Sequence, residues 1–511
     1  MGEPYRRTRT PPPVAVWEIA GMRIRRHAVA LLASAFVLAG GGVGAAVVEA
    51  SSARPVGAAP SIAWRPCSGG QCGSLAVPLD PAKPRGRTIR LALFRSRATT
   101  SGRPKGVLLI NPGGPGGSGI DATRYLSSAL PAKVRKYFDL VGWDPRGTGA
   151  STSIDCGKRL DYLFTPDTAP DSPAERTELE RASARFANEC ARRSGALLAH
   201  VSSQDTVGDM ERIRVALGER RINYLGYSYG TLLGALYASR YPDHIRTMVL
   251  DGAVDPTVSP EASLIQQAQG FDAGLARFFG WCDSHRTCGF GDGDSAAAYH
   301  QLRAATDAQP LRDHGRTFGP TQVDLGVGSW LYAGEDGYRS LAQGLAELRD
   351  GDPSILQSAA DDYVGRRGNG TYDPSWGAFL AISCLDGPPL GDTAALAAVS
   401  ERAAAAAPEF GAASVGLGTP CASWPTKPVF PAPAPIRAPG APPIVVIGTR
   451  NDPVTPLAWA QGLAGQLGVG HLVIGPGAQH TGYPQGDGCL DPIVNAYLLS
   501  GRVPADDAAC G

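Results

Sequence analysis

The chain has 511 residues, of which 43% are hydrophobic and 19% charged, so it is a globular protein with enough length for a large core and an inserted second layer. Its 48 Lys and Arg against 47 Asp and Glu give a formal net charge of +1. This balance predicts no basic face for nucleic acid, and we expect no nucleic-acid partner.

The N-terminal segment has the composition of an export signal. Three arginines, Arg23, Arg25 and Arg26, precede an apolar run from Ala28 to Ala39. Small residues follow this run, and they suit cleavage after Ala50, Ala53 or Ala58.

A membrane anchor is the alternative, because the uncharged run extends to Val48. Three consecutive glycines at 40–42 interrupt that run, so we expect residues 1–58 to be removed, with Met22 a candidate start. The mature protein is then expected to be secreted, either extracellular or associated with the cell wall, without stable membrane insertion.

Ten cysteines follow the signal segment, and they occur as local pairs along the chain. In an exported protein an even number of paired cysteines predicts disulfides. Zinc binding is the alternative, but no Cys-x2-Cys or His-x3-His spacing occurs. Neighbour pairing predicts the bonds 67–72, 156–190, 282–288, 384–421 and 489–510.

Apolar segments of strand length recur in two parts of the chain. Residues 59–88, rich in Pro and Gly, predict an extended loop, and the alternation over 89–97 predicts an antiparallel or edge strand. Continuous apolar strands are expected at 106–110, 138–143, 223–227, 247–250, 444–447 and 471–474. Helices are expected over 170–200 and from a cap at Asp205 or Thr206 to Leu217.

Strands that alternate with helices predict an α/β fold, a mostly parallel sheet covered by helices. The alternation stops between residues 257 and 430, which hold helix-like segments, and it returns after a Pro-rich connector at 428–443. We therefore expect an α/β-hydrolase core of residues 59–256 and 431–511, interrupted by a large, mainly helical lid at 257–430.

The sequence Gly226-Tyr-Ser-Tyr-Gly230 lies between a predicted strand and a predicted helix. In that context Gly-x-Ser-x-Gly is the nucleophile elbow of α/β-hydrolases, a strained turn that lifts the serine to the positive end of a helix. In a chain with 65 glycines the five residues alone are a weak signal. The flanking strand and helix make Ser228 the candidate nucleophile.

A serine nucleophile needs a base and an acid that orients the base, and α/β-hydrolases place them in the chain order Ser, Asp, His at strand ends. Asp452 follows the strand at 444–447, and His480 follows the strand at 471–474 through a Gly-rich loop. Their positions, more than their residue types, predict a catalytic role. Two rival acids, Asp487 and Asp491, come after the histidine in the chain.

Acyl transfer also needs N–H donors for the developing oxyanion. One is expected from the amide of Tyr229, directly after the nucleophile. The other is expected from Gly114, in the glycine run at 113–119 that follows an early strand. Pro112 and Pro115 stiffen this loop, as an oxyanion loop requires and a flexible linker does not.

Several motifs together resemble the secreted tripeptidyl-aminopeptidase-like branch of the prolyl-aminopeptidase family, a group of actinobacterial α/β-hydrolases. They are Asn111-Pro-Gly-Gly-Pro-Gly-Gly-Ser-Gly119, Asp144-Pro-Arg-Gly-Thr-Gly149, Gly226-Tyr-Ser-Tyr-Gly-Thr231, Ile382-Ser-Cys-Leu-Asp386 and Asp452-Pro-Val-Thr-Pro456. The resemblance covers about residues 60–511 and is specific as a set. The sequence departs from the family at Gly477-Ala-Gln-His480-Thr, where a glycine often stands beside the histidine.

The resemblance implies a serine exopeptidase that forms an acyl-enzyme on peptides with free N-termini and needs no metal or cofactor. A carboxylesterase with the same triad is the alternative, because the family includes such enzymes. A binding protein on an inactive hydrolase scaffold is a third hypothesis, against which the complete triad argues.

Acidic groups in or near the lid bind the substrate's ammonium group in that family. The candidates here are Glu335, Asp336, Asp361, Asp362 and Asp386, and nothing in the sequence singles one out. Two further family positions, Asp144 and Arg146, are expected to brace the loop beside the active site.

The expected lid leaves the sheet after Asp251 and returns before Asp452, both at carboxyl ends of strands. Because ligands bind at that edge in open α/β folds, the lid should cover Ser228 and select chain ends.

Overall fold

A computed structural model describes residues 61–430, 432–505 and 507–510. The predicted signal segment, 1–58, lies outside these residues. Within the described ranges, no helix combines the length and the apolar character that a membrane crossing requires.

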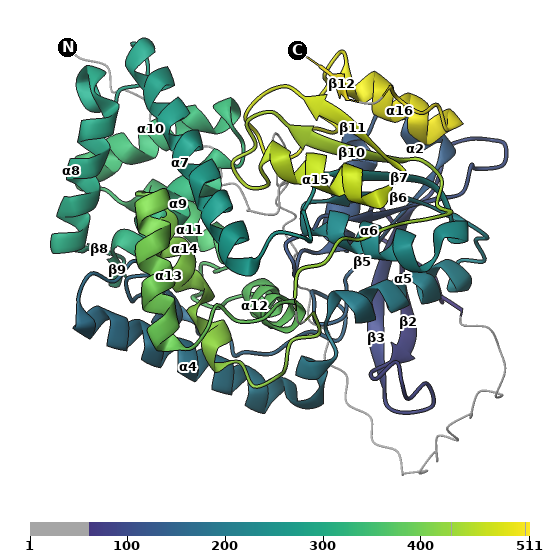
Figure 1. Cartoon of the computed structure of the whole chain (residues 1–511), viewed down its shortest axis with the longest axis horizontal. Helices are drawn as coiled ribbons and strands as arrows, with labels where there is room; N and C mark the ends of the chain where they lie inside the picture. The colour runs from purple at the N-terminus through teal and green to yellow at the C-terminus, as the bar shows by residue number, and fades with distance from the viewer. Residues whose placement is uncertain (1–60, 431, 506, 511) are drawn as a thin grey trace, which may run out of the picture.

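A ten-stranded sheet forms the centre of the α/β-hydrolase fold, in the order β1-β2-β3-β5-β4-β6-β7-β10-β11-β12 (Figure 1). Its strands are β1 (Arg65–Cys67), β2 (Gly70–Pro78), β3 (Thr88–Ser96), β4 (Val107–Asn111), β5 (Asp139–Trp143), β6 (Ile222–Tyr227), β7 (Ile245–Asp251), β10 (Ile444–Thr449), β11 (Gly470–Gly475) and β12 (Ala508–Ala509). The pairs from β5 to β12 are parallel, and the pairs that join β1, β2, β3 and β5 are antiparallel.

Helices cover both faces of the sheet, which explains why its central strands are continuous apolar runs. Every residue of β4, β6 and β10 is buried. One face packs against α1 (Gly119–Ala129), α2 (Ala132–Tyr137) and α16 (Leu490–Ser500). The other face packs against α5 (Ser203–Ala216), α6 (Tyr229–Arg240) and α15 (Leu457–Leu467).

The predicted loop over residues 59–88 is wrong in part, because this segment contains the β1–β2 hairpin. Leu75 and Val77 alternate with exposed residues along β2 and point into the core, while the Gly and Pro residues around them hide the pattern. Thr88–Ser96 is antiparallel as expected, but it lies between β2 and β5 and is not an edge strand.

The N-cap of α5 also differs from the prediction. Ser202 caps the helix, and Asp205 completes a capping box by accepting from the Ser202 backbone. Asp205 is therefore the third residue of the helix and not its cap. The sequence contains both residues of this capping box, and the cap lies three residues before the predicted Asp205.

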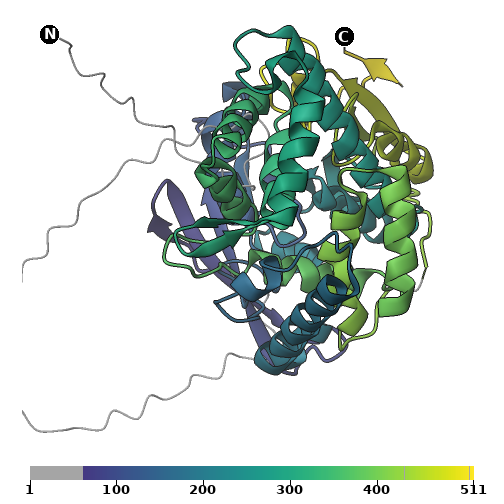
Figure 2. The same ribbon diagram turned by 90° about the vertical axis from the view of Figure 1, so that its left-hand side faces the viewer.

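Between β7 and β10 the chain forms a helical layer beside the sheet, which faces the viewer in Figure 2. Its elements are α7 (Pro260–Ser284), α8 (Ser295–Ala308), β8 (Leu311–Asp313), β9 (Arg316–Phe318), α9 (Pro320–Leu331), α10 (Glu335–Arg349), α11 (Ser354–Tyr363), α12 (Ser375–Asp386), α13 (Thr393–Ala406) and α14 (Gly411–Gly418). We call these elements, with the loops that join them and the segment after α14 up to residue 430, the lid. An earlier helix, α4 (Pro173–Ser194), lies along it, with Phe186 packed against Trp424.

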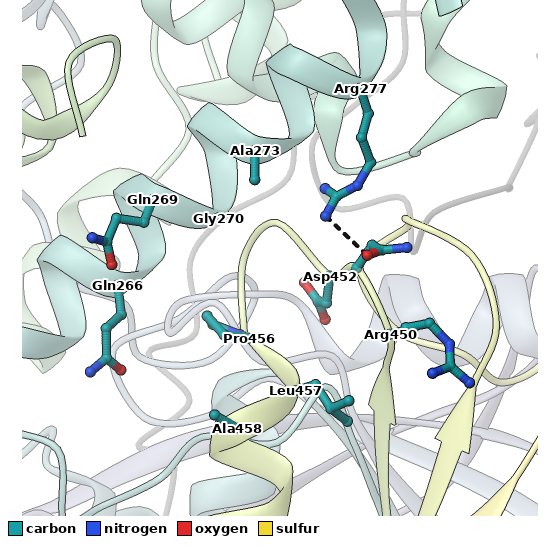
Figure 3. Close-up of a pocket in the computed structure, with 11 residues that line it drawn as sticks. Gln266, Gln269, Gly270, Ala273, Arg277, Arg450, Asp452, Pro456, Leu457 and Ala458 are labelled. Atoms are coloured by element: carbon teal, nitrogen blue, oxygen red, sulfur yellow. Dashed lines mark hydrogen bonds between the residues drawn. The ribbon is translucent and has the colours of Figure 1, made fainter. Parts of the chain in front are cut away.

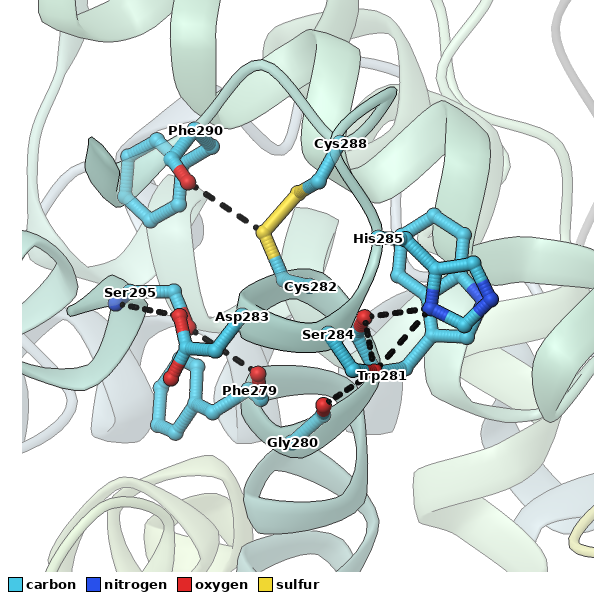
Figure 4. Close-up of a disulfide and its surroundings, with 10 residues drawn as sticks. All are labelled: Phe279, Gly280, Trp281, Cys282, Asp283, Ser284, His285, Cys288, Phe290 and Ser295. Carbon is cyan, nitrogen blue, oxygen red and sulfur yellow. Dashed lines mark hydrogen bonds between the residues drawn. A yellow bond between two sulfur atoms is a disulfide. The ribbon is translucent and has the colours of Figure 1, made fainter. Parts of the chain in front are cut away.

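Five disulfides join the ten cysteines in the predicted neighbour pairs. Because every cysteine is in a disulfide, none offers a thiolate to zinc. Two of the bonds lie in the lid region, Cys384–Cys421 and Cys282–Cys288. The second closes the loop after α7, where the Cys282 sulfur lies 3.2 Å from the carbonyl oxygen of Phe290 (Figure 4).

Candidate active site

Ser228 occupies the sharp turn between β6 and α6, with φ 52° and ψ −128°. This left-handed conformation is strained for a serine, as the nucleophile elbow requires. The glycines on either side are sterically obligatory: a Cβ on Gly226 would lie 2.5 Å from the Gly230 carbonyl oxygen, and a Cβ on Gly230 would lie 2.8 Å from the carbonyl oxygen of Asn111. The Ser228 N–H donates to the main-chain oxygen of Asp251 at 2.8 Å, which fixes the turn against β7.

Asp452 and His480 are brought together at the same edge of the sheet. The His480 Nδ1 lies 2.9 Å from Oδ2 and 3.1 Å from Oδ1 of Asp452, and both residues are buried. The carboxylate also accepts from the N–H groups of Val454 and Thr455 and from the Thr455 hydroxyl, at 2.8, 3.0 and 2.8 Å. These donors hold the acid so that it orients the imidazole through Nδ1.

The other ring nitrogen of His480 is the atom that would receive a proton from the nucleophile. Nε2 is buried and has no hydrogen-bond partner within the described part of the chain, so no bond to Ser228 is present. The ring is nevertheless adjacent to the strand end that holds Ser228, since a Cβ on Gly252 would lie 3.0 Å from the His480 Cε1. Catalytic hydrogen bonds often tighten only when substrate binds.

The two predicted oxyanion donors lie on adjoining loops. A Cβ on Gly113 would lie 2.9 Å from the Tyr229 nitrogen and 3.0 Å from the Ser228 Cβ, so the glycine loop lies directly against the elbow. Gly113 and Gly114 both have left-handed φ values, 89° and 108°. Among the described residues, the amides of Gly114 and Tyr229 donate to no protein atom, which leaves them available to an oxyanion.

The lid contacts the catalytic base directly, a relationship that the sequence did not predict. The main-chain N–H of His480 donates to the main-chain oxygen of Tyr332 at 2.8 Å. The rings of the two residues meet edge to face with centroids 5.5 Å apart. Gly334 packs so closely on the same loop that a Cβ would lie 2.8 Å from the Ala478 carbonyl carbon. The position of the base therefore depends on the lid.

The C-terminal part of the chain, residues 407–510, matches the family described as TAP-like protein. The chain is 37% identical to the serine protease Hip1 of Mycobacterium tuberculosis over 88% of this chain and 91% of that protein. It is 32% identical to the tripeptidyl aminopeptidase of Streptomyces lividans over 91% and 89%, and 34% identical to carboxylesterase B of Mycobacterium tuberculosis over 97% and 99%. The chain belongs to the TAP-like family of α/β-hydrolases.

For a serine hydrolase of the TAP-like family, this arrangement indicates a division of roles. Ser228 Oγ would attack the scissile carbonyl while its proton passes to Nε2 of His480, and Asp452 would stabilise the resulting imidazolium. The amides of Gly114 and Tyr229 are placed to stabilise the negative charge on the carbonyl oxygen. The imidazolium would then give its proton to the leaving group, which departs. In the second half of the reaction His480 would take a proton from the attacking water and return it to the Ser228 Oγ as the acyl group leaves.

In this TAP-like hydrolase Asp144 and Arg146 brace the loops around the site, as predicted from their family motif. Asp144 accepts from the Ser118 hydroxyl at 2.7 Å and the Ala150 N–H at 2.7 Å, and so ties α1 to the turn after β5. Burial raises the pKa of Asp144, although these donors oppose the shift. Arg146 is fully buried and forms a bidentate ion pair with Asp209, in which Nε and Nη2 each lie 2.8 Å from a carboxylate oxygen.

The five acidic candidates for the substrate ammonium group lie in different environments. Glu335 and Asp336 are exposed in the first turn of α10. Asp361 is neutralised by Arg316 and Arg366, with its nearest contact to Arg316 at 2.7 Å. The remaining two, Asp362 and Asp386, are half-buried, and the Asp386 carboxylate is bound by Ser203 and Tyr229.

A pocket of about 340 Å³ opens between α7 and the loop that carries Asp452 (Figure 3). Arg277 crosses it and donates to the Asn451 side chain at 2.9 Å, and Gln266 and Gln269 lie farther along the same helix. Asp452 lines this pocket, whereas Ser228 and His480 do not, so the pocket borders the acid and does not include the nucleophile or the base.

Proposed function

We propose that the protein is a secreted serine exopeptidase that releases residues or short peptides from free N-termini through an acyl-enzyme. The observation that carries this proposal is the position of the lid, which contacts the loops of all three triad residues. It meets the base at Tyr332, the acid loop through Gln267 (2.9 Å to the Val454 carbonyl oxygen) and the elbow through Asp386. We infer that a substrate bound between these contacts presents a chain end to Ser228.

A row of aromatic rings supports an enclosed, partly apolar substrate site. From His480 the rings of Tyr332, Tyr363, Trp376 and Phe379 follow one another with centroid distances of 5.5, 6.1, 6.3 and 5.1 Å. At the far end, a Cβ on Gly116 of the glycine loop would lie 2.9 Å from the Phe379 nitrogen. We call these four rings the aromatic row. It joins the base to the oxyanion loop, so we expect substrates with apolar side chains.

Two of the named relatives support a peptidase, and the third supports the esterase alternative. The named serine protease and tripeptidyl aminopeptidase are as similar to this chain as the named carboxylesterase. Both reactions use the same triad and oxyanion hole, so the substrate site decides between them. Secretion is part of the proposal because five disulfides suit an oxidising compartment.

A peptide-library digest with mass-spectrometric readout tests the proposal, with matched peptides whose N-termini are free or acetylated. We expect cleavage near free N-termini and a large loss on acetylation. Ser228→Ala should abolish turnover and leave the fold intact. Equal rates on free and acetylated peptides would favour the esterase. Fast cleavage of internal bonds in a long acetylated substrate would refute the exopeptidase assignment.

A further inference from the structure

Another buried acid, Asp251, lies at the end of the strand between those that precede Ser228 and Asp452. It is the last residue of β7, paired in register with Tyr227 of the nucleophile strand on one side and with Ile447 of the acid strand on the other. Its side chain is 0% exposed. It therefore cannot reach a substrate, and the reaction described above gives it no role.

The contacts of Asp251 connect the nucleophile with the base. Its carboxylate accepts the N–H of Gly482 at 2.9 Å and the N–H of Tyr483 at 2.7 Å, two and three residues after His480. Its main-chain oxygen accepts the Ser228 N–H at 2.8 Å. Asp251 thus holds both the backbone of Ser228 and the backbone that follows His480.

The loop that Asp251 holds is strained where it follows the base. Thr481 has φ 70°, a left-handed conformation that a β-branched residue rarely adopts, and it is buried. Such a conformation persists only where the surroundings enforce it. The two amides bound by the carboxylate come immediately after Thr481, so they supply part of that enforcement.

We propose that Asp251 is a positioning residue for catalysis, whose carboxylate aligns the His480 loop and adds a second negative charge, besides Asp452, that stabilises the imidazolium. Charge–charge interactions are strong in a buried, low-dielectric site, so a carboxylate at this position acts on the base without touching it. The charge and the loop alignment act together, since the same oxygens that carry the charge accept the two amides.

The ionisable groups that face Asp251 are His480, Asp452 and the buried phenol of Tyr227. Burial raises the pKa of Asp251 to about 7, while the Gly482 and Tyr483 amides and His480 oppose the shift and Asp452 adds to it. Formation of the imidazolium during attack by Ser228 therefore favours the ionised carboxylate. The proton itself still moves only from the Ser228 Oγ to the His480 Nε2.

The first test compares wild type with Asp251→Asn, and uses Asp255→Asn as the matched control. Asp255 lies four residues later, and its carboxylate accepts from Gln466 at 2.6 Å and not from the His480 loop. Turnover of p-nitrophenyl acetate is measured from pH 5 to 9, with active enzyme counted by a fluorophosphonate probe.

We expect Asp251→Asn to lower kcat about 10–100-fold with KM changed less than about threefold, because the loss falls on the transition state. The acid limb of its kcat/KM profile should move to lower pH by up to about 0.5 unit, because the imidazolium loses a neighbouring negative charge that Asp251, with a pKa of about 7, carries in part over this range. Asp255→Asn should match wild type in both respects. A lower kcat with an unmoved acid limb would reduce Asp251 to a structural support and refute its role as a charge.

A second test needs no folded variant at position 251. Labelling wild type with 15N-tyrosine gives a sparse amide spectrum, in which the Tyr483 signal is assigned by its loss in Tyr483→Phe. Because this N–H is bound to the Asp251 carboxylate, its proton shift should titrate with a midpoint near pH 7, and phosphonylation of Ser228 should change that midpoint. A Tyr483 amide that does not titrate between pH 5 and 9 would overturn the proposal.

Discussion

The hydroxyl of Tyr229 donates a hydrogen bond to the carboxylate of Asp386 at 2.9 Å. Tyr229 directly follows the nucleophile and supplies a predicted oxyanion donor, whereas Asp386 is the last residue of α12 in the lid. Ser203, at the start of α5, completes the cluster by donating its N–H to Asp386 at 2.7 Å. A single half-buried carboxylate therefore joins the lid to the nucleophile elbow.

Removing this hydroxyl should affect both stability and catalysis. We expect Tyr229→Phe to lower the free energy of unfolding by about 1–2 kcal/mol, since a hydrogen bond to a charged group is lost. The same change should lower kcat/KM about 3–10-fold, because the oxyanion amide is less firmly aligned. Denaturant unfolding and peptide turnover measure the two effects.

The matched control is Tyr299→Phe, a buried phenol in the lid that bonds to no described residue. It should leave both quantities close to wild type or raise stability slightly, because it removes an unsatisfied polar group. If the two variants behaved alike, the Tyr229–Asp386 bond would have no special role.

The strands that precede Ser228, Asp452 and His480 could be predicted from the sequence because each is an apolar run, and the structure brings Asp452 and His480 within hydrogen-bond distance. Burial on both faces makes β6 and β10 visible without knowledge of their partners, whereas β11 is buried only in part. The contacts of Tyr332 and Asp386 with the site could not be predicted in this way. They depend on how the lid helices pack on a sheet far away in the sequence, and neither residue stands in a local pattern.

Asp251 was visible in the sequence as the end of a strand, but its role was not. An aspartate before a glycine is ordinary at a strand end, and its partners, Gly482 and Tyr483, lie more than 200 residues later. The β1–β2 hairpin was missed for the opposite reason. Local Gly and Pro residues predicted a loop, whereas pairing with β3 decides the structure.

Mild acid should stabilise the fold while it inhibits the enzyme. Burial raises the pKa of Asp386 to about 6 and that of Asp251 to about 7, above the ordinary value of 3.8 expected in the unfolded chain. Between pH 4 and 7 the folded protein thus binds more protons, and its free energy of unfolding decreases as pH rises. Activity has the opposite trend, since the base must be neutral.

Calorimetry at pH 5 and pH 7.5 checks the sign of this effect. We expect the protein to be more stable at pH 5, by about 1 kcal/mol from Asp386 alone, and activity to return fully at pH 7.5. Asp386→Asn, which cannot titrate, should show a smaller pH dependence. A lower melting temperature at pH 5 than at pH 7.5 would contradict the prediction.

The choice of Asp452 over the rival acid Asp491 can be tested by a matched pair of amide variants. Asp452→Asn should lower kcat by about 10³–10⁴-fold, because the imidazole loses its orienting carboxylate. Asp491 instead accepts the Gly486 N–H at 2.9 Å, at the start of α16, so Asp491→Asn should change kcat by less than about threefold. A comparable loss in both would mean that the acid is wrongly assigned.

The Cys384–Cys421 disulfide should stabilise the lid beside Asp386, and so support the hydrogen bond between Asp386 and Tyr229. It spans 37 residues and holds α12 two residues before Asp386. Replacing both cysteines by serine should lower the free energy of unfolding by about 2–4 kcal/mol and reduce kcat/KM. The Cys67–Cys72 bond spans 5 residues in the β1–β2 hairpin and serves as the control, because its loss should leave kcat/KM unchanged. Equal losses of activity would show that the lid bond does not support the site.

The glycine loop gives the sharpest test of how closely the oxyanion hole is packed. Gly113 has φ 89°, and a Cβ there would lie 2.4 Å from the Tyr227 carbonyl oxygen and 3.0 Å from the Ser228 Cβ. Gly113→Ala must therefore move the loop away from the elbow and displace the Gly114 amide. We expect kcat to fall by about 10²–10³-fold, the loss typical of one missing oxyanion donor, with a smaller change in KM.

Gly280→Ala is the control, because this helical glycine of α7 has no neighbour within 4 Å of an added Cβ. The change should raise stability by up to about 1 kcal/mol without loss of activity. A Gly113→Ala enzyme with wild-type kcat would place the second donor outside this loop.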